Sequence, residues 1–246
     1  MTRPAGQAGA LAALIREAGG EPLELPAIEI RDLADLAPLR AVAGRLESFD
    51  YAIFVSRNAV RKGFALLGRP WPAHLRVATV GAGSREELAL QGFADVIAPA
   101  TRFDSEALLA LPEFSDVAGR RIVIFRGEGG RTYLGETLAA RGAVVEHAPC
   151  YRRVMPEAGR TGLDAAWAHG KVDAILVSSA EGLANLLEML GSSGAQRLAG
   201  TALFVPHERV AGEASRQGLG RVLVAGPADA QVTAALVAYF GGASYN

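Results

Sequence analysis

Two glycine-rich junctions in this sequence could bind an anion. "VGAGSREEL", Val80–Leu88, joins an apolar run to a helical pattern, and Ser84 is placed to cap that helix. "FRGEGGRTYL", Phe125–Leu134, carries Arg126 and Arg131 beside glycines. Main-chain N–H groups and the positive end of a helix dipole favour a carboxylate or a phosphate at such a junction. A capped tight turn and a solvated loop would use the same residues, so both interpretations stay open.

One tyrosine could assist a proton transfer. The proline-bounded segment "HAPCYRRVMP", His147–Pro156, predicts an extended chain, in which alternation places Tyr151 and Arg153 on one face and Arg152 on the other. The phenol of Tyr151 could donate a proton or a hydrogen bond to a ligand. A tyrosine on a strand more often serves packing, which is the plainer interpretation.

Several kinds of chemistry have no support in the sequence. Glu86 replaces the third glycine of a dinucleotide fingerprint, and the loop after Arg126 lacks the Gly-Lys-Ser/Thr ending of a phosphate loop. The four histidines lack metal-ligand spacing, and no Gly-x-Ser-x-Gly elbow is present. The single cysteine, Cys150, excludes a Cys-rich metal site and is expected to be a buried packing residue. We therefore expect no metal site.

The overall charge offers no general attraction for polyanions. Among 246 residues, 25 basic side chains stand against 26 acidic ones, giving a formal charge of −1. We therefore expect no nucleic-acid or membrane partner, and an anionic ligand must be met by local charge. No signal segment follows Met1, and the apolar runs are too short to span a bilayer. These features favour a soluble, cytoplasmic protein, and we expect a monomer.

The elements that must position these residues alternate between two patterns. Short Val- and Ile-rich runs such as "YAIFV", "RVATV", "RIVIF" and "ALFV" alternate with helical patterns such as "GALAALIREAGG". Strands buried on both faces lose the apolar/polar alternation, so this order predicts an α/β fold with largely parallel sheets. Glycines 19, 92, 142 and 218 each follow a helical run and predict left-handed helix ends.

The chain also repeats itself. "FDYAIFVSRNAV" returns as "VDAILVSSAEGL", and a shift of 123 positions aligns an ordered set of residues. The aligned pairs include Arg3 with Arg126, Gly6 with Gly129, Leu11 with Leu134, Gly19 with Gly142, Pro26 with Pro149, Asp50 with Asp173 and Ser56 with Ser179. This order predicts an internal duplication.

The two copies differ at their start. "RRIVIF" precedes Arg126, whereas only Met1 and Thr2 precede Arg3. The first copy is therefore expected to lack its opening strand. Either the start is late, or the chain was trimmed, or that sheet has one strand fewer.

The ordered combination of motifs resembles the uroporphyrinogen-III synthase family almost end to end. The segments that carry the resemblance are "TRPAGQAGALAALIREAGGEPLELPAIEI", "FDYAIFVSRNAV", "VATVGAGSREELALQG", "GRRIVIFRGEGGRTYLGETLAARGAVVEHAPCYRR" and "FVPHERVAGEA". The resemblance implies two flavodoxin-like, doubly wound parallel-sheet domains joined by a two-stranded ribbon. Domain 1 would comprise residues 1–27 and 155–246, the ribbon 28–31 and 150–154, and domain 2 residues 32–149.

The resemblance also implies a reaction. Hydroxymethylbilane, a polycarboxylate small-molecule substrate, would be cyclised without a cofactor to uroporphyrinogen III, with inversion of ring D through a spiro-pyrrolenine. Tyr151 is the expected catalytic residue. Expected substrate contacts from the family match are Ser56, Asn58, Ser84, Ser178, Ser179 and His207, which lies in a turn where relatives often carry small hydroxyl residues. Arg3, Arg126 and Arg131 are added on electrostatic grounds.

Two other classes remain as alternatives. A two-lobed small-molecule-binding or regulatory module without catalysis would have the same pair of α/β lobes. A receiver-type signalling domain is less well supported, because it needs acidic residues at a strand end, whereas Asp50 stands at the start of its strand.

Overall fold

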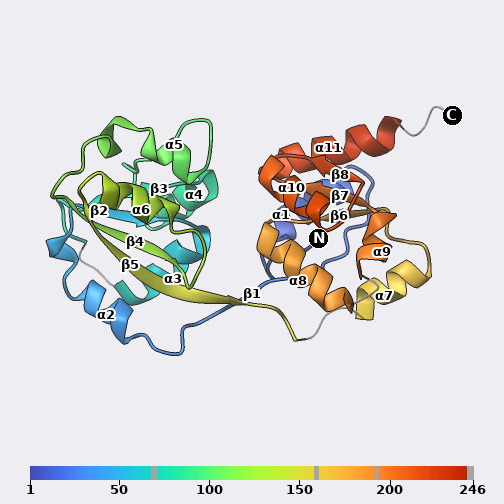
Figure 1. Cartoon of the computed structure of the whole chain (residues 1–246), viewed down its shortest axis with the longest axis horizontal. Helices are drawn as coiled ribbons and strands as arrows, with labels where there is room; N and C mark the ends of the chain where they lie inside the picture. The colour runs from blue at the N-terminus through green and yellow to red at the C-terminus, as the bar shows by residue number, and fades with distance from the viewer. Residues whose placement is uncertain (68–70, 158–160, 192–193, 243–246) are drawn as a thin grey trace. The chain divides into compact units, whose positions relative to one another are not determined.

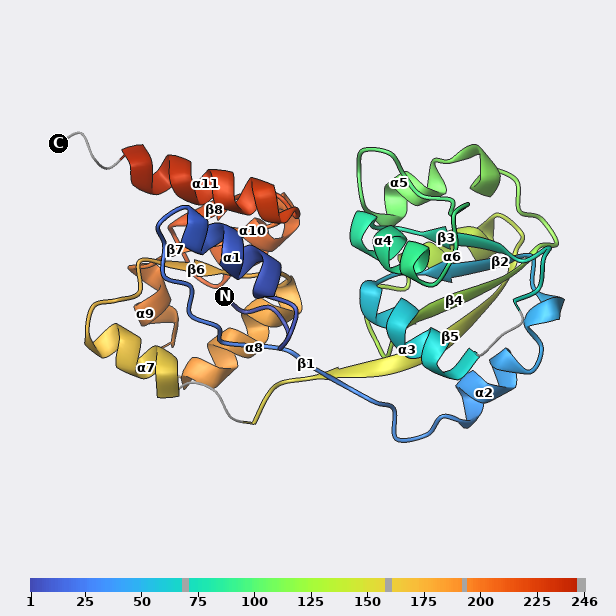
Figure 2. The same cartoon turned by 180° about the vertical axis from the view of Figure 1, so that it is seen from behind.

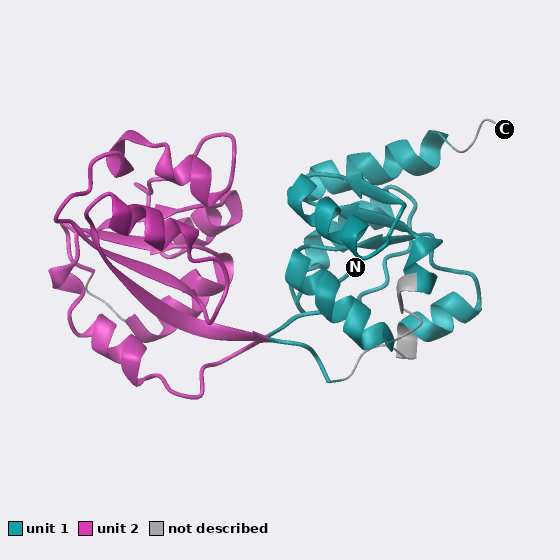
Figure 3. Cartoon of the chain, viewed as in Figure 1, with its two compact units in different colours: residues 1–29, 154–246 teal, residues 30–153 magenta. Residues whose placement is uncertain are grey.

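The chain divides into two compact units (Figure 3). The computed structural model describes residues 1–67, 71–157, 161–191 and 194–242. Unit 1 comprises residues 1–29 and 154–246, and unit 2 comprises residues 30–153. The chain therefore starts in unit 1, passes through the whole of unit 2 and returns, as the colours of Figure 1 show.

Unit 2 is built on a five-stranded sheet of order β1-β5-β4-β2-β3. The strands are β1 (Glu29–Arg31), β2 (Tyr51–Phe54), β3 (Arg76–Thr79), β4 (Arg121–Gly127) and β5 (Val144–Val154). β2 pairs in parallel with β3 and β4, and β4 pairs in parallel with β5. All four residues of β2 are buried, which explains why that strand reads as a continuous apolar run. The expected parallel α/β architecture is confirmed here.

Helices cover both faces of this sheet. They are α2 (Ala37–Ala43), α3 (Arg57–Leu67), α4 (Ala82–Leu90), α5 (Ser105–Leu109) and α6 (Tyr133–Ala140), with short 3-10 turns at Leu46–Ser48 and Pro112–Phe114. Alternate residues of β4 enter different cores: Val123 and Phe125 pack with residues of α3 and α4, whereas Ile122 and Ile124 pack with residues of α5 and α6. β4 is therefore buried on both sides.

Unit 1 has a three-stranded parallel sheet of order β6-β7-β8. Its strands are β6 (Ala174–Leu176), β7 (Ala202–Val205) and β8 (Val222–Val224). Its helices are α1 (Gly9–Glu17), α7 (Thr161–Ala168), α8 (Ala180–Leu190), α9 (Gly194–Ala199), α10 (Glu208–Arg216) and α11 (Asp229–Gly241). Leu183 and Leu186 of α8 share a core with Leu203 and Val205 of β7.

Local geometry repeats between the units as the duplication predicts. Gly19 follows α1 and Gly142 follows α6, and their φ angles are +86° and +85°. Gly92 after α4 and Gly218 after α10 also have positive φ, so the expected left-handed helix ends are confirmed. In the part of the chain that the structure describes, no strand precedes Arg3, whereas Arg126 lies near the end of β4. β5 runs from Val144 to Val154 without a break at the expected start of a separate ribbon at residue 150.

Candidate functional site

A serine and a tyrosine meet at the carboxyl end of β2. Ser56 follows β2, and its Oγ accepts the N–H of Ala59 at 3.0 Å, so it caps α3. The same Oγ lies 3.0 Å from Oη of Tyr151 on β5. The side chain of Tyr151 is 2% exposed. Its phenol is therefore linked through Ser56 to the positive end of α3.

A glycine leaves room for the tyrosine ring. A Cβ placed on Gly127 would lie 2.9 Å from Cε2 and Cζ of Tyr151. The register between β4 and β5 shifts between Arg126 and Gly127, which brings Tyr151 opposite this glycine. A larger residue at 127 would displace the ring, so Gly127 fixes where the phenol can lie.

Two arginines converge beside the loop that follows β4. A Cβ placed on Gly130 would lie 3.2 Å from Nη2 of Arg153 and 3.3 Å from Nη2 of Arg126. Arg126 also donates to the carbonyl oxygens of Gly127 and Gly129. Burial and then the neighbouring charge of Arg153 lower the pKa of Arg126. An anion bound between the two guanidinium groups would relieve this repulsion.

A neutral histidine adjoins this arginine pair. Nδ1 of His147 lies 3.5 Å from Nη1 of Arg126. Burial and then the charge of Arg126 lower the pKa of His147, so the imidazole is uncharged near neutral pH. The ring therefore adds no positive charge to the arginine pair.

Arg131 is held separately from the pair. Its guanidinium lies 2.7 Å from Glu106 of α5 and 5.3 Å from the centre of the Tyr133 ring. The hydrogen bond from Arg131 lowers the pKa of Glu106. Arg131 therefore carries a local acidic partner.

The expectation that Ser84 caps α4 is wrong. α4 begins at Ala82, its N-cap is the extended residue Gly81, and Ser84 lies buried in the first turn. The guanidinium of Arg57 occupies the space where Gly83 would carry a side chain, and it pairs with Glu86 at 3.1 Å. The start of α4 is thus partly covered by a cation. Asn58 lies half-buried in the first turn of α3.

Unit 1 has its own cavity at the carboxyl ends of its strands. This cavity of about 230 Å³ is lined by Arg3, Ser178 and His207, with Val177 and Phe204 among its apolar walls. Arg3 is paired with Asp229 of α11 at 2.6 Å. His207 is exposed at the N-cap position of α10. Three of the expected contacts therefore come together.

Ser179 stands next to that cavity as a helix cap. Its Oγ accepts the N–H of Gly182 at 3.0 Å and caps α8. Ser56 accepts the N–H of Ala59 at the same distance, three residues further along the chain in each case. Ser56 and Ser179, which the repeat aligns, thus cap equivalent helices in the two units.

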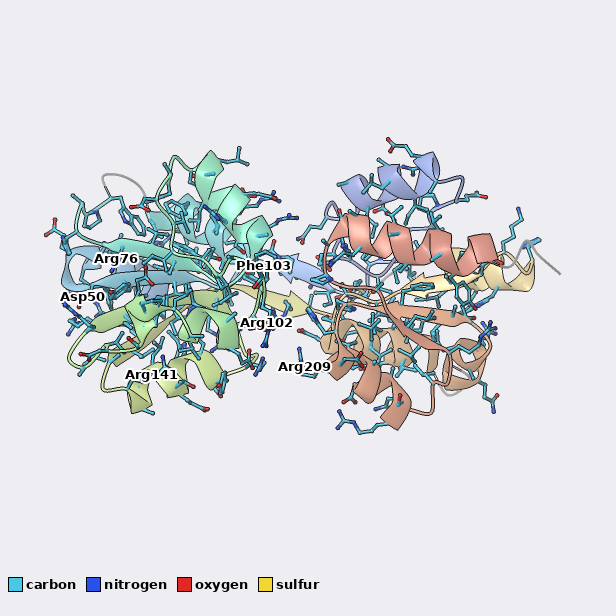
Figure 4. The ribbon with its side chains drawn as sticks, turned by 90° about the horizontal axis from the view of Figure 1, so that it is seen from above. Asp50, Arg76, Arg102, Phe103, Arg141 and Arg209 are labelled. Carbon is cyan, nitrogen blue, oxygen red and sulfur yellow. The ribbon has the colours of Figure 1, made fainter. Side chains whose placement is uncertain are left out.

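Sequence reasoning missed three residues of this region. Strand alternation places Arg153 on the face of Tyr151 but assigns it no role. Gly127 and Gly130 matter because the Tyr151 ring packs against the first and the guanidinium groups of Arg126 and Arg153 lie beside the second. Figure 4 shows Arg102 and Phe103 at one end of unit 2 and Asp50 and Arg76 at the other.

Other reactive groups have structural surroundings. Burial raises the pKa of the Cys150 thiol to about 12, so it is not a thiolate nucleophile. Within the described ranges, no three His, Cys, Asp or Glu side chains are grouped so that they could hold a metal ion. Among the same residues, no helix combines the length and the apolar character that a membrane span requires.

Comparisons with known proteins identify the family. The family model "Uroporphyrinogen-III synthase HemD" matches residues 9–233. Uroporphyrinogen-III synthase of Salmonella typhimurium is 34% identical over 93% of this chain and 95% of its own length, and that of Escherichia coli is 30% identical over the same shares.

Solved structures share the fold. A mutant uroporphyrinogen III synthase of Thermus thermophilus superimposes with a TM-score of 0.63 at 19% identity, covering 97% of this chain and 98% of that one. The Helicobacter pylori uroporphyrinogen-III synthetase gives 0.58 at 15% identity, covering 87% and 92%. Because the family model and both curated relatives span nearly the whole sequence, this chain belongs to the uroporphyrinogen-III synthase family.

Proposed function

We infer that this protein closes hydroxymethylbilane to uroporphyrinogen III in tetrapyrrole biosynthesis. The substrate loses its terminal hydroxyl as water, and the substituted carbon of ring D attacks the methylene carbon of the resulting azafulvene. The spiro-pyrrolenine that forms then fragments and recloses, which inverts ring D. The observation that carries this function is the family match over residues 9–233, together with relatives of the same activity that cover 93% of the chain.

We propose that each unit is a flavodoxin-like domain and that β1 and the outer part of β5 form the connecting ribbon. In support, helices of unit 2 lie on both faces of its parallel sheet. Ligands of open α/β sheets bind beyond the carboxyl ends of the strands, which is where Ser56, Tyr151 and Arg126 stand. Unit 1 presents its cavity at the same end of its own sheet.

The phenol of Tyr151 is the proposed acid that helps the hydroxyl leave. Ser56 accepts a main-chain hydrogen bond from α3 and can donate its own proton to Oη of Tyr151. The phenolic proton is then free to point at a ligand, and the positive end of α3 favours the developing phenolate. Positioning the chain before ring closure would supply most of the remaining effect.

Carboxylate recognition is proposed at two local sites. In unit 2, Arg126 and Arg153 would clamp one carboxylate beside Gly130. In unit 1, Arg3, Ser178 and His207 line a cavity that could receive another, with Ser179 beside it. Asn58, Ser84 and Arg131 stay predicted contacts, and we expect the protein to act as a monomer.

Product analysis tests this function directly. The purified protein is given hydroxymethylbilane, and the type I and type III products are separated. Spontaneous closure gives the type I isomer, so an excess of the type III isomer is expected only with an active enzyme. Formation of type I alone, with tight binding of the linear tetrapyrrole, would instead support a binding module without catalysis.

A further inference from the structure

Arg57 places a cation at the amino ends of two helices. It is the first residue of α3, and its guanidinium lies over Gly83 in the first turn of α4, in the space that a side chain at 83 would need. α3 and α4 pack side by side (Figure 2). The amino end of a helix carries a partial positive charge, so both helices disfavour a cation here. An anion bound beside Arg57 would remove this conflict.

The present partner of Arg57 is a weak one. Nη2 of Arg57 lies 3.1 Å from a carboxylate oxygen of Glu86, and the two side chains are 52% and 73% exposed. Ion pairs that are surrounded by water to this degree contribute little to stability. Among the described residues of α4, none in the first turn is acidic. The carboxylate of a ligand could therefore replace Glu86 beside the guanidinium.

Other donors at the start of α4 point the same way. The N–H groups of Ser84 and Arg85 donate to the carbonyl oxygen of Gly81, whereas those of Ala82 and Gly83 have no main-chain acceptor among the residues that the structure describes. Ser84 is 5% exposed, and its Oγ lies 3.8 Å from the Cβ position of Gly81. Within the described ranges this hydroxyl has no hydrogen-bond partner. Buried polar groups are normally paired, so the hydroxyl indicates that a further polar atom belongs there.

This position adjoins the proposed chemistry. Ser56, the residue before Arg57, contacts Oη of Tyr151. β2 and β3 are neighbouring parallel strands, so the helices that follow them start at the same edge of the sheet. A group held at the start of α4 can therefore belong to the same bound molecule as the group that faces Tyr151.

We propose that Arg57 binds one carboxylate of the tetrapyrrole at the start of α4, and that Glu86 competes with this carboxylate for the guanidinium. The inference rests on the proposed function, which supplies a substrate with several carboxylates. Arg57 donates to one carboxylate oxygen, and the N–H groups of Ala82 and Gly83 donate to the other. Glu86 keeps the arginine over the site before the substrate arrives, and its competition sets the affinity.

Two variants distinguish this role from a structural ion pair. Arg57→Gln and Glu86→Gln both break the pair, so a purely structural contact predicts the same result for both. We expect Glu86→Gln to lower the KM for hydroxymethylbilane about two- to fivefold, the range that exposed ion pairs span. We expect Arg57→Gln to raise this KM about tenfold, as loss of a charge-assisted hydrogen bond does. A KM that rises in both variants, or changes in neither, would overturn the inference.

Arg216→Gln and Glu213→Gln are the matched controls. Arg216 and Glu213 form an ion pair at 2.6 Å in α10, with side chains 72% and 32% exposed. The two controls change the overall charge as the test variants do, and any general attraction of a polyanionic substrate would appear in them. Because distant exposed charges are screened by salt, KM is expected to stay within about twofold of the unchanged protein. A KM lowered as much in Glu213→Gln as in Glu86→Gln would refute local competition.

Amide NMR signals test the site without turnover. Uroporphyrin I, a closed polycarboxylate tetrapyrrole, is titrated into the protein, and the signals of Ala82 and Gly83 are expected to move at lower concentration in Glu86→Gln and at higher concentration in Arg57→Gln. Inorganic phosphate is titrated in parallel, and equal shifts at equal concentration would indicate a site for free anions instead. Signals that stay unmoved by the porphyrin would overturn the inference, whereas failure of the unchanged protein to form the type III isomer would count against the proposed function.

Discussion

At the scale of single residues, the hydroxyl of Tyr151 is the group whose removal is most informative. Tyr151→Phe keeps the ring beside Gly127 and removes only the bond to Ser56. We expect the rate of type III formation to fall about 100-fold or more, as for loss of a general acid, while the free energy of unfolding falls by about 1 kcal/mol.

The matched control is Tyr51→Phe. Oη of Tyr51 accepts a hydrogen bond from Arg76 at 3.1 Å, at the start of β2 and away from Ser56. This variant should lose similar stability and keep its rate. Equal rates in the two variants would remove Tyr151 from the chemistry.

A second prediction at this scale concerns the replacement of Gly127. Gly127→Ala puts a methyl group 2.9 Å from the Tyr151 ring, so the ring must move. We expect unfolding to become easier by about 1–3 kcal/mol and type III formation to slow with it. Gly212→Ala is the control, because that exposed position in α10 has no neighbour within 4 Å of the new atom. A glycine within a helix costs about 1 kcal/mol relative to alanine, so this variant should gain stability.

The arginine pair predicts a change in substrate binding. Arg126→Gln removes one of the two cations that converge beside Gly130. We expect KM to rise about tenfold or more, since charge-assisted hydrogen bonds contribute about 1.5–3 kcal/mol, with a smaller effect on kcat. Arg120→Gln removes a cation paired with Asp50 at the start of β2, at 3.1 Å, and serves as the control. A KM that changes equally in both variants would refute a local carboxylate site.

At the scale of elements, two equivalent helix N-caps, Ser56 and Ser179, allow an effect on stability to be distinguished from an effect on activity. Ser56→Ala and Ser179→Ala each remove an N-cap bond of 3.0 Å, from α3 and α8. Each should lower the free energy of unfolding by about 1 kcal/mol, measured by denaturant titration. Only Ser56 also contacts Tyr151. Kinetics of type III formation should therefore slow more in Ser56→Ala, and the reverse order would contradict the proposed link from α3 to the phenol.

Elements were more predictable from the sequence than their contacts. Parallel strands such as β2 could be predicted because burial on both faces leaves an uninterrupted apolar run. Ser84 was misassigned because "GAGS" offers two possible caps, and extended Gly81 serves one turn earlier. The meeting of Arg126 and Arg153 depends on a register shift between β4 and β5, which strand alternation alone does not encode.

At the scale of the whole molecule, one sequence pattern recurs in the two units. The same cap and the same left-handed glycine recur in both units. β4, however, fills the middle of its sheet, whereas unit 1 has only Met1 and Thr2 in the matching position. The surroundings of the Met1 amino group are therefore set by residues 23–25 and β6 of unit 1.

The Met1 amino group leads to a prediction of how the free energy of unfolding depends on pH. Burial, opposed by the charge of Glu24, lowers the pKa of the Met1 amino group from 8.0 to about 6. Between these values the unfolded chain binds more protons than the folded one, so the free energy of unfolding should rise from pH 6 to pH 8. Because Met1 is partly exposed, we expect a gain of about 1–2 kcal/mol, below the full value for two pKa units. Acetylation of the Met1 nitrogen removes this titration and should flatten the curve in that range. The depressed pKa of His147 adds a rise only below about pH 6.5, and this part should survive acetylation. A slope between pH 7 and pH 8 that acetylation leaves unchanged would place the responsible group elsewhere.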